Sequence, residues 1–186
     1  MGVIDKALSE IDRADFVPME LIGEAYLDMT LPIGYDQTIS QPSTVRMMLE
    51  WLDAQPRDKV LDVGSGSGWT IALLSSIVGP EGFVFAVEVI PEILKFGKAN
   101  CSRLNIHNVK FSLAKNDVYG LPSQAPYDRI LVSASATELP IELVDQVRVG
   151  GKLVIPVQND IFEIYKTSDK KWITIIHPGF VFVPLV

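Results

Sequence analysis

The chain has 186 residues, of which 48% are hydrophobic and 21% are charged, and its formal net charge at pH 7 is −7. A chain of this length and composition can bury the core of one globular domain, and we expect a single domain over residues 1–186. An acidic surface repels phosphate backbones, which argues against nucleic acid as a partner.

Several classes of protein are disfavoured by simple features of the sequence. The N-terminal stretch "MGVIDKALSEIDRADF" is charged throughout, unlike a signal peptide, and no run of about 18 apolar residues occurs. The one cysteine, Cys101, excludes an intrachain disulfide and is expected to be a small core residue. His107 and His177 lie far apart without metal-ligand spacing, so no metal site is expected. We therefore expect a cytoplasmic protein that does not enter a membrane.

Two helices are predicted in the first part of the chain, over residues 2–12 and 44–54. The second has Val45, Met48, Leu49 and Leu52 on one face. Between them lies the polar, turn-rich segment "LPIGYDQTISQPS" (31–43), which offers few residues for a core. Either Ser40 or Ser43 could cap the helix that follows it.

Strands and helices alternate from about residue 58 onward. The predicted strands span residues 59–64, 82–89, 109–114, 127–135, 152–157, 162–167 and 172–177. The predicted helices span residues 68–79, 91–105 and 140–149, the last closed by Gly150-Gly151. Crossover connections make the first four strands parallel, and short connections favour antiparallel pairing of the last three. The fold expected is a doubly wound, mostly parallel α/β sheet with antiparallel strands at the C-terminus and N-terminal helices.

The stretch "LDVGSGSGW" (61–69) joins the first strand of this sheet to the next helix. Gly64, Gly66 and Gly68 allow a sharp turn and a close approach of the backbone to a ligand. Glu88, 20 residues after Gly68, ends the next strand and suits two ribose hydroxyls. A dinucleotide fingerprint would place its third glycine where Trp69 stands. The spacing, with Asp62 before the loop, is the one used by S-adenosylmethionine enzymes. A nicotinamide site and a tight turn that serves packing alone remain alternatives.

Longer motifs make the sequence recognisable. "RADFVP", "AYLDMTLPIGYDQTISQPS", "VLDVGSGSGW", "VEVIPE", "APYDRILVSAS" and "GGKLVIPV" occur in an order and spacing that resemble those of protein-L-isoaspartate O-methyltransferases, over roughly residues 13–158. The resemblance implies a Rossmann-like methyltransferase domain. In it, residues 1–57 would supply the N-terminal helices and a segment covering cofactor and substrate, and residues 58–186 would form the core.

The resemblance also implies roles for individual residues. Ser40 would be catalytic. The positions expected to contact S-adenosylmethionine or its product S-adenosylhomocysteine are Gln37, Thr38, Ile39, Ser40, Asp62, Gly64, Ser65, Gly66, Gly68, Glu88, Val89, Asn116 and Asp117. The family usually has Gly-Asp-Gly where this chain has Lys115-Asn116-Asp117. The Asn116 carbonyl could accept a hydrogen bond from the adenine amino group, more weakly than an aspartate would.

The function implied is methyl transfer to the free carboxylate of L-isoaspartyl residues in damaged proteins and peptides, by an enzyme expected to be a monomer. One alternative is a methyltransferase of the same fold with another substrate. A further alternative is a non-catalytic protein that binds S-adenosylmethionine.

Overall fold

The computed structural model describes residues 2–115 and 117–185. Its α-helices are α1 (Val3–Glu10), α2 (Pro42–Leu52), α3 (Trp69–Val78), α4 (Pro91–Arg103) and α5 (Ile141–Gln146). Short 3-10 helices are η1 (Arg13–Phe16), η2 (Met19–Glu24) and η3 (Pro122–Gln124). The strands are β1 (Leu31–Gly34), β2 (Gln37–Ile39), β3 (Lys59–Val63), β4 (Phe83–Glu88), β5 (Val109–Leu113), β6 (Tyr127–Val132), β7 (Val147–Val157), β8 (Asp160–Ser168) and β9 (Lys171–Pro178).

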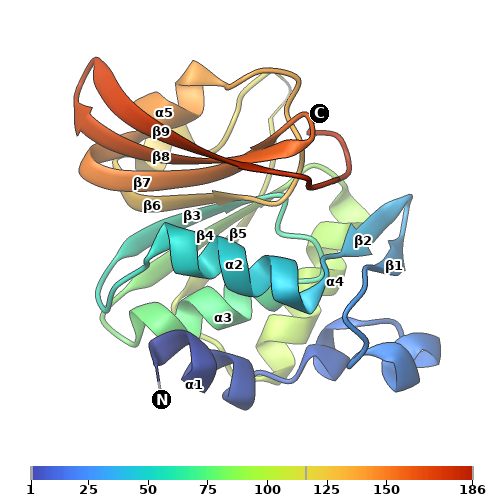
Figure 1. Ribbon diagram of the computed structural model, residues 1–186. Coiled ribbons are helices and arrows are strands. Elements are labelled where there is room, and N and C mark those ends of the chain that lie inside the picture. The colour runs from blue at the N-terminus through green and yellow to red at the C-terminus, as the bar shows by residue number, and fades with distance from the viewer. Residues whose placement is uncertain (1, 116, 186) are drawn as a thin grey trace.

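Seven strands form one sheet in the order β5-β4-β3-β6-β7-β8-β9 (Figure 1). Strands β5, β4, β3, β6 and β7 are parallel to their neighbours, whereas β7-β8 and β8-β9 are antiparallel. The sequence-based prediction of a doubly wound, mostly parallel sheet with antiparallel C-terminal strands is therefore confirmed. The strand order reverses at β3, because the connection from β3 leads to β4 on one side and β6 lies on the other side.

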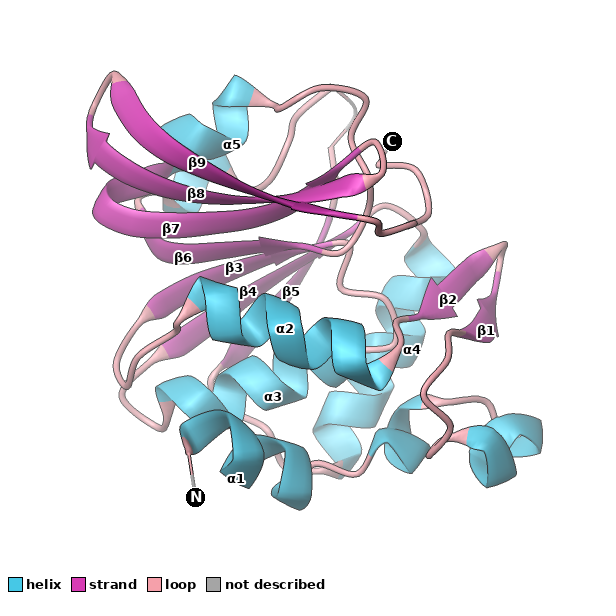
Figure 2. Cartoon of the chain, in the orientation of Figure 1, coloured by secondary structure: helices cyan, strands magenta, loops and turns pink. Residues whose placement is uncertain are grey.

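Helices cover the two faces of the sheet unequally (Figure 2). Apolar residues of α1, α2, α3 and α4 pack with one face, where Val60, Val84 and Leu131 are buried. On the other face, Leu61, Phe85 and Ile130 pack against α5 and the loops around η3. The central strands are thus buried on both faces, which explains why they read as short apolar runs in the sequence.

The segment 31–43 contains a β-hairpin that the sequence did not reveal. Tyr35 and Asp36 have φ angles of 55° and 56°, as a two-residue hairpin turn requires, and β1 pairs with β2. Leu31, Ile33 and Ile39 are buried, so the segment contributes to the core after all.

Helix α2 starts at Pro42 and is not capped by Ser40 or Ser43. Instead, the Asp28 carboxylate accepts hydrogen bonds from the Ser43 backbone N–H (2.9 Å) and from Gln41 Nε2 (3.0 Å). A carboxylate at this end of a helix satisfies a free N–H and complements the helix dipole. The capping prediction for the two serines was wrong because the cap comes from a residue fourteen positions before the helix.

The end of α5 also differs from the prediction. The helix stops at Gln146, and Gly150-Gly151 lies inside β7. The Lys166 Nζ, almost completely buried, donates to the carbonyl oxygens of Val144 (3.0 Å), Asp145 (3.3 Å) and Val147 (2.8 Å). These carbonyls lie at the C-terminal end of α5, where a helix leaves most of its last carbonyls without a partner further along the helix. A side chain from β8 therefore ends the helix, which no local pattern could indicate.

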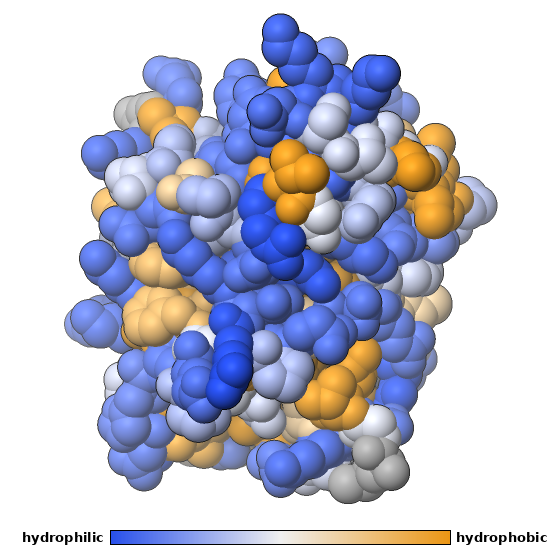
Figure 3. Space-filling model, turned by 90° about the vertical axis from the view of Figure 1, so that its left-hand side faces the viewer, coloured by the Kyte–Doolittle hydropathy of each residue, from blue (hydrophilic) through white to orange (hydrophobic). Residues whose placement is uncertain are grey.

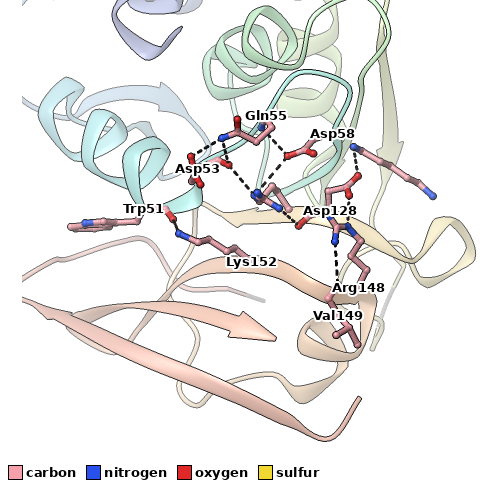
Figure 4. A network of polar contacts seen from close by, with 10 residues as sticks. Trp51, Asp53, Gln55, Asp58, Asp128, Arg148, Val149 and Lys152 are labelled. Carbon is pink, nitrogen blue, oxygen red and sulfur yellow. Dashed lines mark hydrogen bonds and ion pairs between the residues drawn. The ribbon is translucent and has the colours of Figure 1, made fainter. Parts of the chain in front are cut away.

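A polar network closes the amino end of the parallel strands (Figure 4). The Asp58 carboxylate accepts from the Gln55 N–H (2.8 Å) and lies 3.7 Å from Arg129 Nε. The buried Arg129 guanidinium also donates to the carbonyls of Asp53 (3.1 Å) and Asp128 (3.0 Å). This network fixes the α2-β3 connection at the opposite end of the strands from the carboxyl-end loops.

The surface at the left of Figure 1 is mostly hydrophilic, with small, separate apolar patches (Figure 3). Scattered apolar side chains of this kind are usual on folded proteins. None of the helices in the described residues combines the length and apolar character needed to cross a membrane.

Replacing Lys166 tests how α5 is terminated. Lys166→Met removes the donor for three backbone carbonyls, two of them in buried hydrogen bonds, and we expect it to lower the free energy of unfolding by about 2 kcal/mol in urea titrations. Lys170→Met, at an exposed position in the same chain region, is the control and should leave stability unchanged. Equal stability of both variants and the wild-type protein would show that the Lys166 contacts contribute nothing.

Candidate active site

A cavity of about 610 Å³ lies at the carboxyl ends of β3, β4 and β6. Its walls come from the β2 strand and Ser40, the loop after β3, the end of β4, residues 114–115 and 117–120, and Ser133-Ala134 after β6. The cavity lies beside the point where the strand order reverses, which is where open α/β sheets bind ligands. Its volume is that of a typical small-molecule site.

The glycine loop packs unusually close to α4. Gly68 has a φ of 88°, and a Cβ atom there would lie 2.9 Å from the Gly97 carbonyl oxygen. A Cβ on Gly97 would lie 2.6 Å from the Gly66 oxygen. Asn100, one turn further along α4, donates from Nδ2 to the Ser67 carbonyl (3.0 Å). Gly68 in the loop, together with Gly97 and the Asn100 amide on α4, therefore fixes the loop conformation. Of these three residues, only Gly68 was identified from the sequence.

Glu88 holds the same loop from the other side. One carboxylate oxygen accepts from the Gly66 N–H (3.0 Å), and the other from the N–H groups of Val89 (2.9 Å) and Ile90 (3.1 Å). Glu88 is buried but lines the cavity, so its carboxylate both fixes the backbone and faces the ligand space. Glu88, which the sequence predicts to bind the ribose hydroxyls, therefore also stabilises the conformation of the glycine loop.

Asp62 lies behind the cavity wall and is hydrogen-bonded to Thr70, which lines the cavity. Its side chain is fully buried, and its Oδ2 accepts a hydrogen bond from the Thr70 hydroxyl (2.5 Å). Burial raises the pKa of Asp62 to about 7, with the Thr70 hydrogen bond opposing the rise. A cationic group close to this carboxyl would favour its ionised form.

Buried polar atoms without a partner gather at this loop. Among the described residues, four buried side-chain atoms lack a hydrogen-bond partner: Arg13 Nε, Asp62 Oδ1, Ser65 Oγ and Trp69 Nε1. Three of them belong to residues 62–69, and Ser65 and Trp69 line the cavity. Because buried polar groups are nearly always paired in folded proteins, such a cluster fits a ligand with polar groups. The residues present therefore fit a cofactor that carries an amino-acid tail.

The structure brings most of the sequence-predicted site residues to one cavity. The lining includes Gln37, Thr38, Ile39, Ser40, Gly64, Ser65, Gly66, Glu88, Val89 and Asp117. Asp62 and Gly68 are not part of the lining and support it from behind, by the contacts described above. Asn116 lies outside the described residues, so its predicted contact with adenine stays a prediction.

Several lining residues were not identified from the sequence. They are Ile33, Val45, Val63, Ser67, Trp69, Thr70, Val87, Ile90, Ala114, Lys115, Val118, Tyr119, Gly120, Ser133, Ala134, Val183, Pro184 and Leu185. The most distant in sequence are residues 183–185, which the Ser135 backbone holds by bonds to Val183 O (2.7 Å) and Leu185 N (2.8 Å). The end of a strand next to the glycine loop is a usable signal for Ser133-Ala134, but no local pattern marks residues 183–185.

The buried Gln146 side chain positions the loop that contains Tyr119 and Gly120. Its Nε2 donates to the Tyr119 carbonyl (2.8 Å) and its Oε1 accepts from the Leu121 N–H (2.9 Å). A Cβ on Gly120 would lie 2.7 Å from Gln146 Oε1, so this contact requires glycine. Gln146 thus acts on the cavity wall from α5, on the far face of the sheet.

Cys101 is buried, as predicted, and burial raises the pKa of its thiol to about 12. A thiol of that pKa is a poor nucleophile at neutral pH. Within residues 2–115 and 117–185, no three His, Cys, Asp or Glu side chains gather in a way that could hold a metal ion.

The raised pKa of Asp62 predicts a specific pH dependence of stability. Between the unfolded value of 3.8 and the folded value of about 7, the folded protein keeps a proton that the unfolded chain has lost, so Asp62 lowers stability as pH rises. Asp62→Asn is neutral throughout, and its stability relative to the wild type should increase by about 3 kcal/mol from pH 5 to pH 8. Urea unfolding at both pH values measures this. Asp169→Asn, in an exposed turn, is the control; a difference for Asp62→Asn that does not change with pH would contradict the assignment.

Known proteins are similar to this chain in sequence and in fold. A family model described as protein-L-isoaspartate(D-aspartate) O-methyltransferase matches residues 2–186. A protein-L-isoaspartate O-methyltransferase from Methanopyrus kandleri is 41% identical over 187 residues, covering 98% of this chain and 83% of that protein.

A solved structure called a protein-L-isoaspartate O-methyltransferase superposes on the whole chain with a TM-score of 0.91 and 29% identity, and this chain spans 62% of its length. A second, a putative enzyme of this type from Plasmodium falciparum in complex with S-adenosyl-L-homocysteine, matches all of this chain and 91% of its own, with a TM-score of 0.86 and 26% identity. With the cavity at the carboxyl ends of β3 and β4, these findings show that the chain belongs to the protein-L-isoaspartate(D-aspartate) O-methyltransferase family.

Proposed function

We propose that this protein transfers a methyl group from S-adenosylmethionine to the free carboxylate of L-isoaspartyl residues in proteins and peptides. The observation that carries the proposal is the single cavity wall shared by the glycine loop, Glu88 and the segment 37–40. Membership of the family and the likeness to a structure in complex with S-adenosyl-L-homocysteine support it.

The residues proposed to hold the cofactor are those predicted from the sequence. Gly64, Ser65 and Gly66 present backbone and hydroxyl groups to the cavity, and Glu88 presents a carboxylate suited to ribose hydroxyls. Asp62 would attract the ammonium group of the amino-acid tail, with Thr70 as the intervening hydroxyl. Gln37, Thr38, Ile39, Val89, Asn116 and Asp117 complete the proposed set, with Gly68 setting the backbone turn.

Bound S-adenosylmethionine supplies an electrophilic methyl group on a positively charged sulfur. An isoaspartyl carboxylate is already ionised near neutral pH, so the protein does not need a strong general base. What the chain has to provide is alignment of a carboxylate oxygen and exclusion of water. Ser40 lines the cavity next to Ile39 and is proposed to orient the carboxylate by donating a hydrogen bond.

The product would be a methyl ester next to a backbone amide. Attack of that amide nitrogen on the ester releases methanol and closes a succinimide ring, and hydrolysis of the ring gives partly normal aspartate. This sequence would repair the damaged linkage without further catalysis.

We also propose that the enzyme acts as a monomer in the cytoplasm and has no nucleic acid partner. The single, buried cysteine fits a reducing compartment, and the net charge of −7 disfavours binding to phosphate backbones.

Methyl incorporation into two versions of one peptide tests the proposed function. With radiolabelled S-adenosylmethionine, we expect label in the isoaspartyl peptide and none above background in the aspartyl peptide. Binding of S-adenosylmethionine without transfer to either peptide would favour the non-catalytic alternative. Equal labelling of both peptides would point to a different methyl acceptor.

Ser40→Ala tests the proposed catalytic role. We expect kcat on the isoaspartyl peptide to fall about 10-fold or more, since misalignment of a reacting group is costly. Cofactor affinity should change far less, because the glycine loop and Glu88 are unaltered. Ser43→Ala, in the same segment but outside the cavity lining, should keep wild-type kcat. A folded Ser40→Ala protein with wild-type turnover would leave the serine with a structural role only.

A further inference from the structure

We propose that Arg13 is a positioning residue for methyl transfer, which fixes the backbone of Ser40 relative to the cofactor loop. The proposal rests on the function proposed above and concerns the same cavity. Arg13 does not line the cavity, and it lies 27 residues before Ser40 in the sequence.

The Arg13 guanidinium holds the whole segment that leads to Ser40. Nη1 donates to the carbonyl oxygens of Ala25 (2.8 Å) and Leu27 (3.4 Å), and Nη2 donates to those of Met29 (2.9 Å) and Ser40 (3.1 Å). The side chain is only 5% exposed. Hydrogen bonds from a buried charged donor are strong, and a planar guanidinium can bridge several acceptors that a lysine ammonium cannot reach together.

The same guanidinium also touches the cofactor side of the cavity. Its central carbon lies 5.4 Å from the centroid of the Trp69 ring, within the range of a cation–π contact. Trp69 is the first residue of α3, directly after the glycine loop, and it lines the cavity. One side chain therefore links the Ser40 backbone to the wall next to the glycine loop.

The short helix η1, which contains Arg13, is hydrogen-bonded to α4, the helix that packs against the glycine loop. Arg103 Nη2 donates to the Asp15 carbonyl of η1 (2.7 Å) and to Asn100 Oδ1 (3.1 Å). Asn100 in turn holds the Ser67 carbonyl of the glycine loop, as described above. The contact with α4 thus positions η1, and the hydrogen bond from Arg13 to the Ser40 carbonyl positions Ser40 relative to η1.

A role confined to folding would not need this geometry. Arg129 is buried to a similar degree and also donates to backbone carbonyls, but it lies at the opposite end of the strands and its acceptors are Asp53 and Asp128. The two arginines therefore form a matched pair. Loss of either removes a buried guanidinium, and only loss of Arg13 alters the backbone at Ser40.

The experiment compares Arg13→Met, Arg13→Lys and Arg129→Met, each at a temperature well below its melting midpoint. We expect both Arg13 variants to lower kcat on an isoaspartyl peptide by about 10-fold, with S-adenosylhomocysteine affinity within about 3-fold of wild type. Arg129→Met should keep wild-type kcat. Arg13→Lys keeps the charge but has one nitrogen where the guanidinium uses two, so it should not restore turnover.

Hydrogen exchange with S-adenosylhomocysteine bound provides a readout that does not depend on activity. Peptides covering residues 25–41 should exchange faster in Arg13→Met than in the wild type or Arg129→Met, while residues 61–69 stay protected. Wild-type protein that fails to methylate the peptide would refute the proposed function, and unchanged exchange of residues 25–41 would then refute the positioning role as well. An active wild type with an equally active Arg13→Met would overturn the Arg13 proposal alone.

Discussion

The close approach of the glycine loop to α4 is the constraint on which the rest of the site depends. The space between Gly66 O and Gly97 is too small for a Cβ atom, and the loop turns through residues whose φ angles are positive. Glu88 then ties the loop to the end of β4, and Asn100 ties it to α4. Backbone amides and side chains of residues 64–67 can face the cavity only because the chain is held so tightly from behind.

A second set of contacts places the N-terminal segment over this loop. Residues 25–41 have little regular structure apart from the short β1-β2 hairpin, and isolated hairpins of that size are marginal in water. Arg13 holds the inner side of the segment, and Asp28 holds its end on α2. The two halves of the cavity, separated by more than twenty residues of sequence, therefore depend on a few buried polar contacts for their relative position.

Much of the fold could be predicted from the sequence because the parallel strands are buried on both faces. The runs at 59–64 and 82–89 are apolar for that reason, and glycine and proline mark where they end. The ends of α5 and α2 could not be predicted in the same way. Lys166 stops α5 from a strand that follows it, and Asp28 caps α2 from a distant loop. Contacts of this kind are tertiary and leave no periodic signal.

In the site, too, residues with local spacing were predictable and residues brought in by tertiary contacts were not. Gly64, Gly66, Gly68 and Glu88 were recognisable because their spacing reflects one local turn and the next strand end. The residues that hold this turn from outside, Gly97 and Asn100, sit on a helix whose pattern is ordinary. Residues 183–185 reach the cavity through a backbone pairing with Ser135 that only the folded chain creates.

We infer that the cavity binds an adenosyl cofactor with an amino-acid tail and not a dinucleotide. Calorimetric titration of the wild-type protein with S-adenosylhomocysteine and, separately, with NAD distinguishes these two ligands. We expect saturable binding of S-adenosylhomocysteine at one site per chain and no measurable heat from NAD. Tighter binding of NAD than of S-adenosylhomocysteine would contradict it.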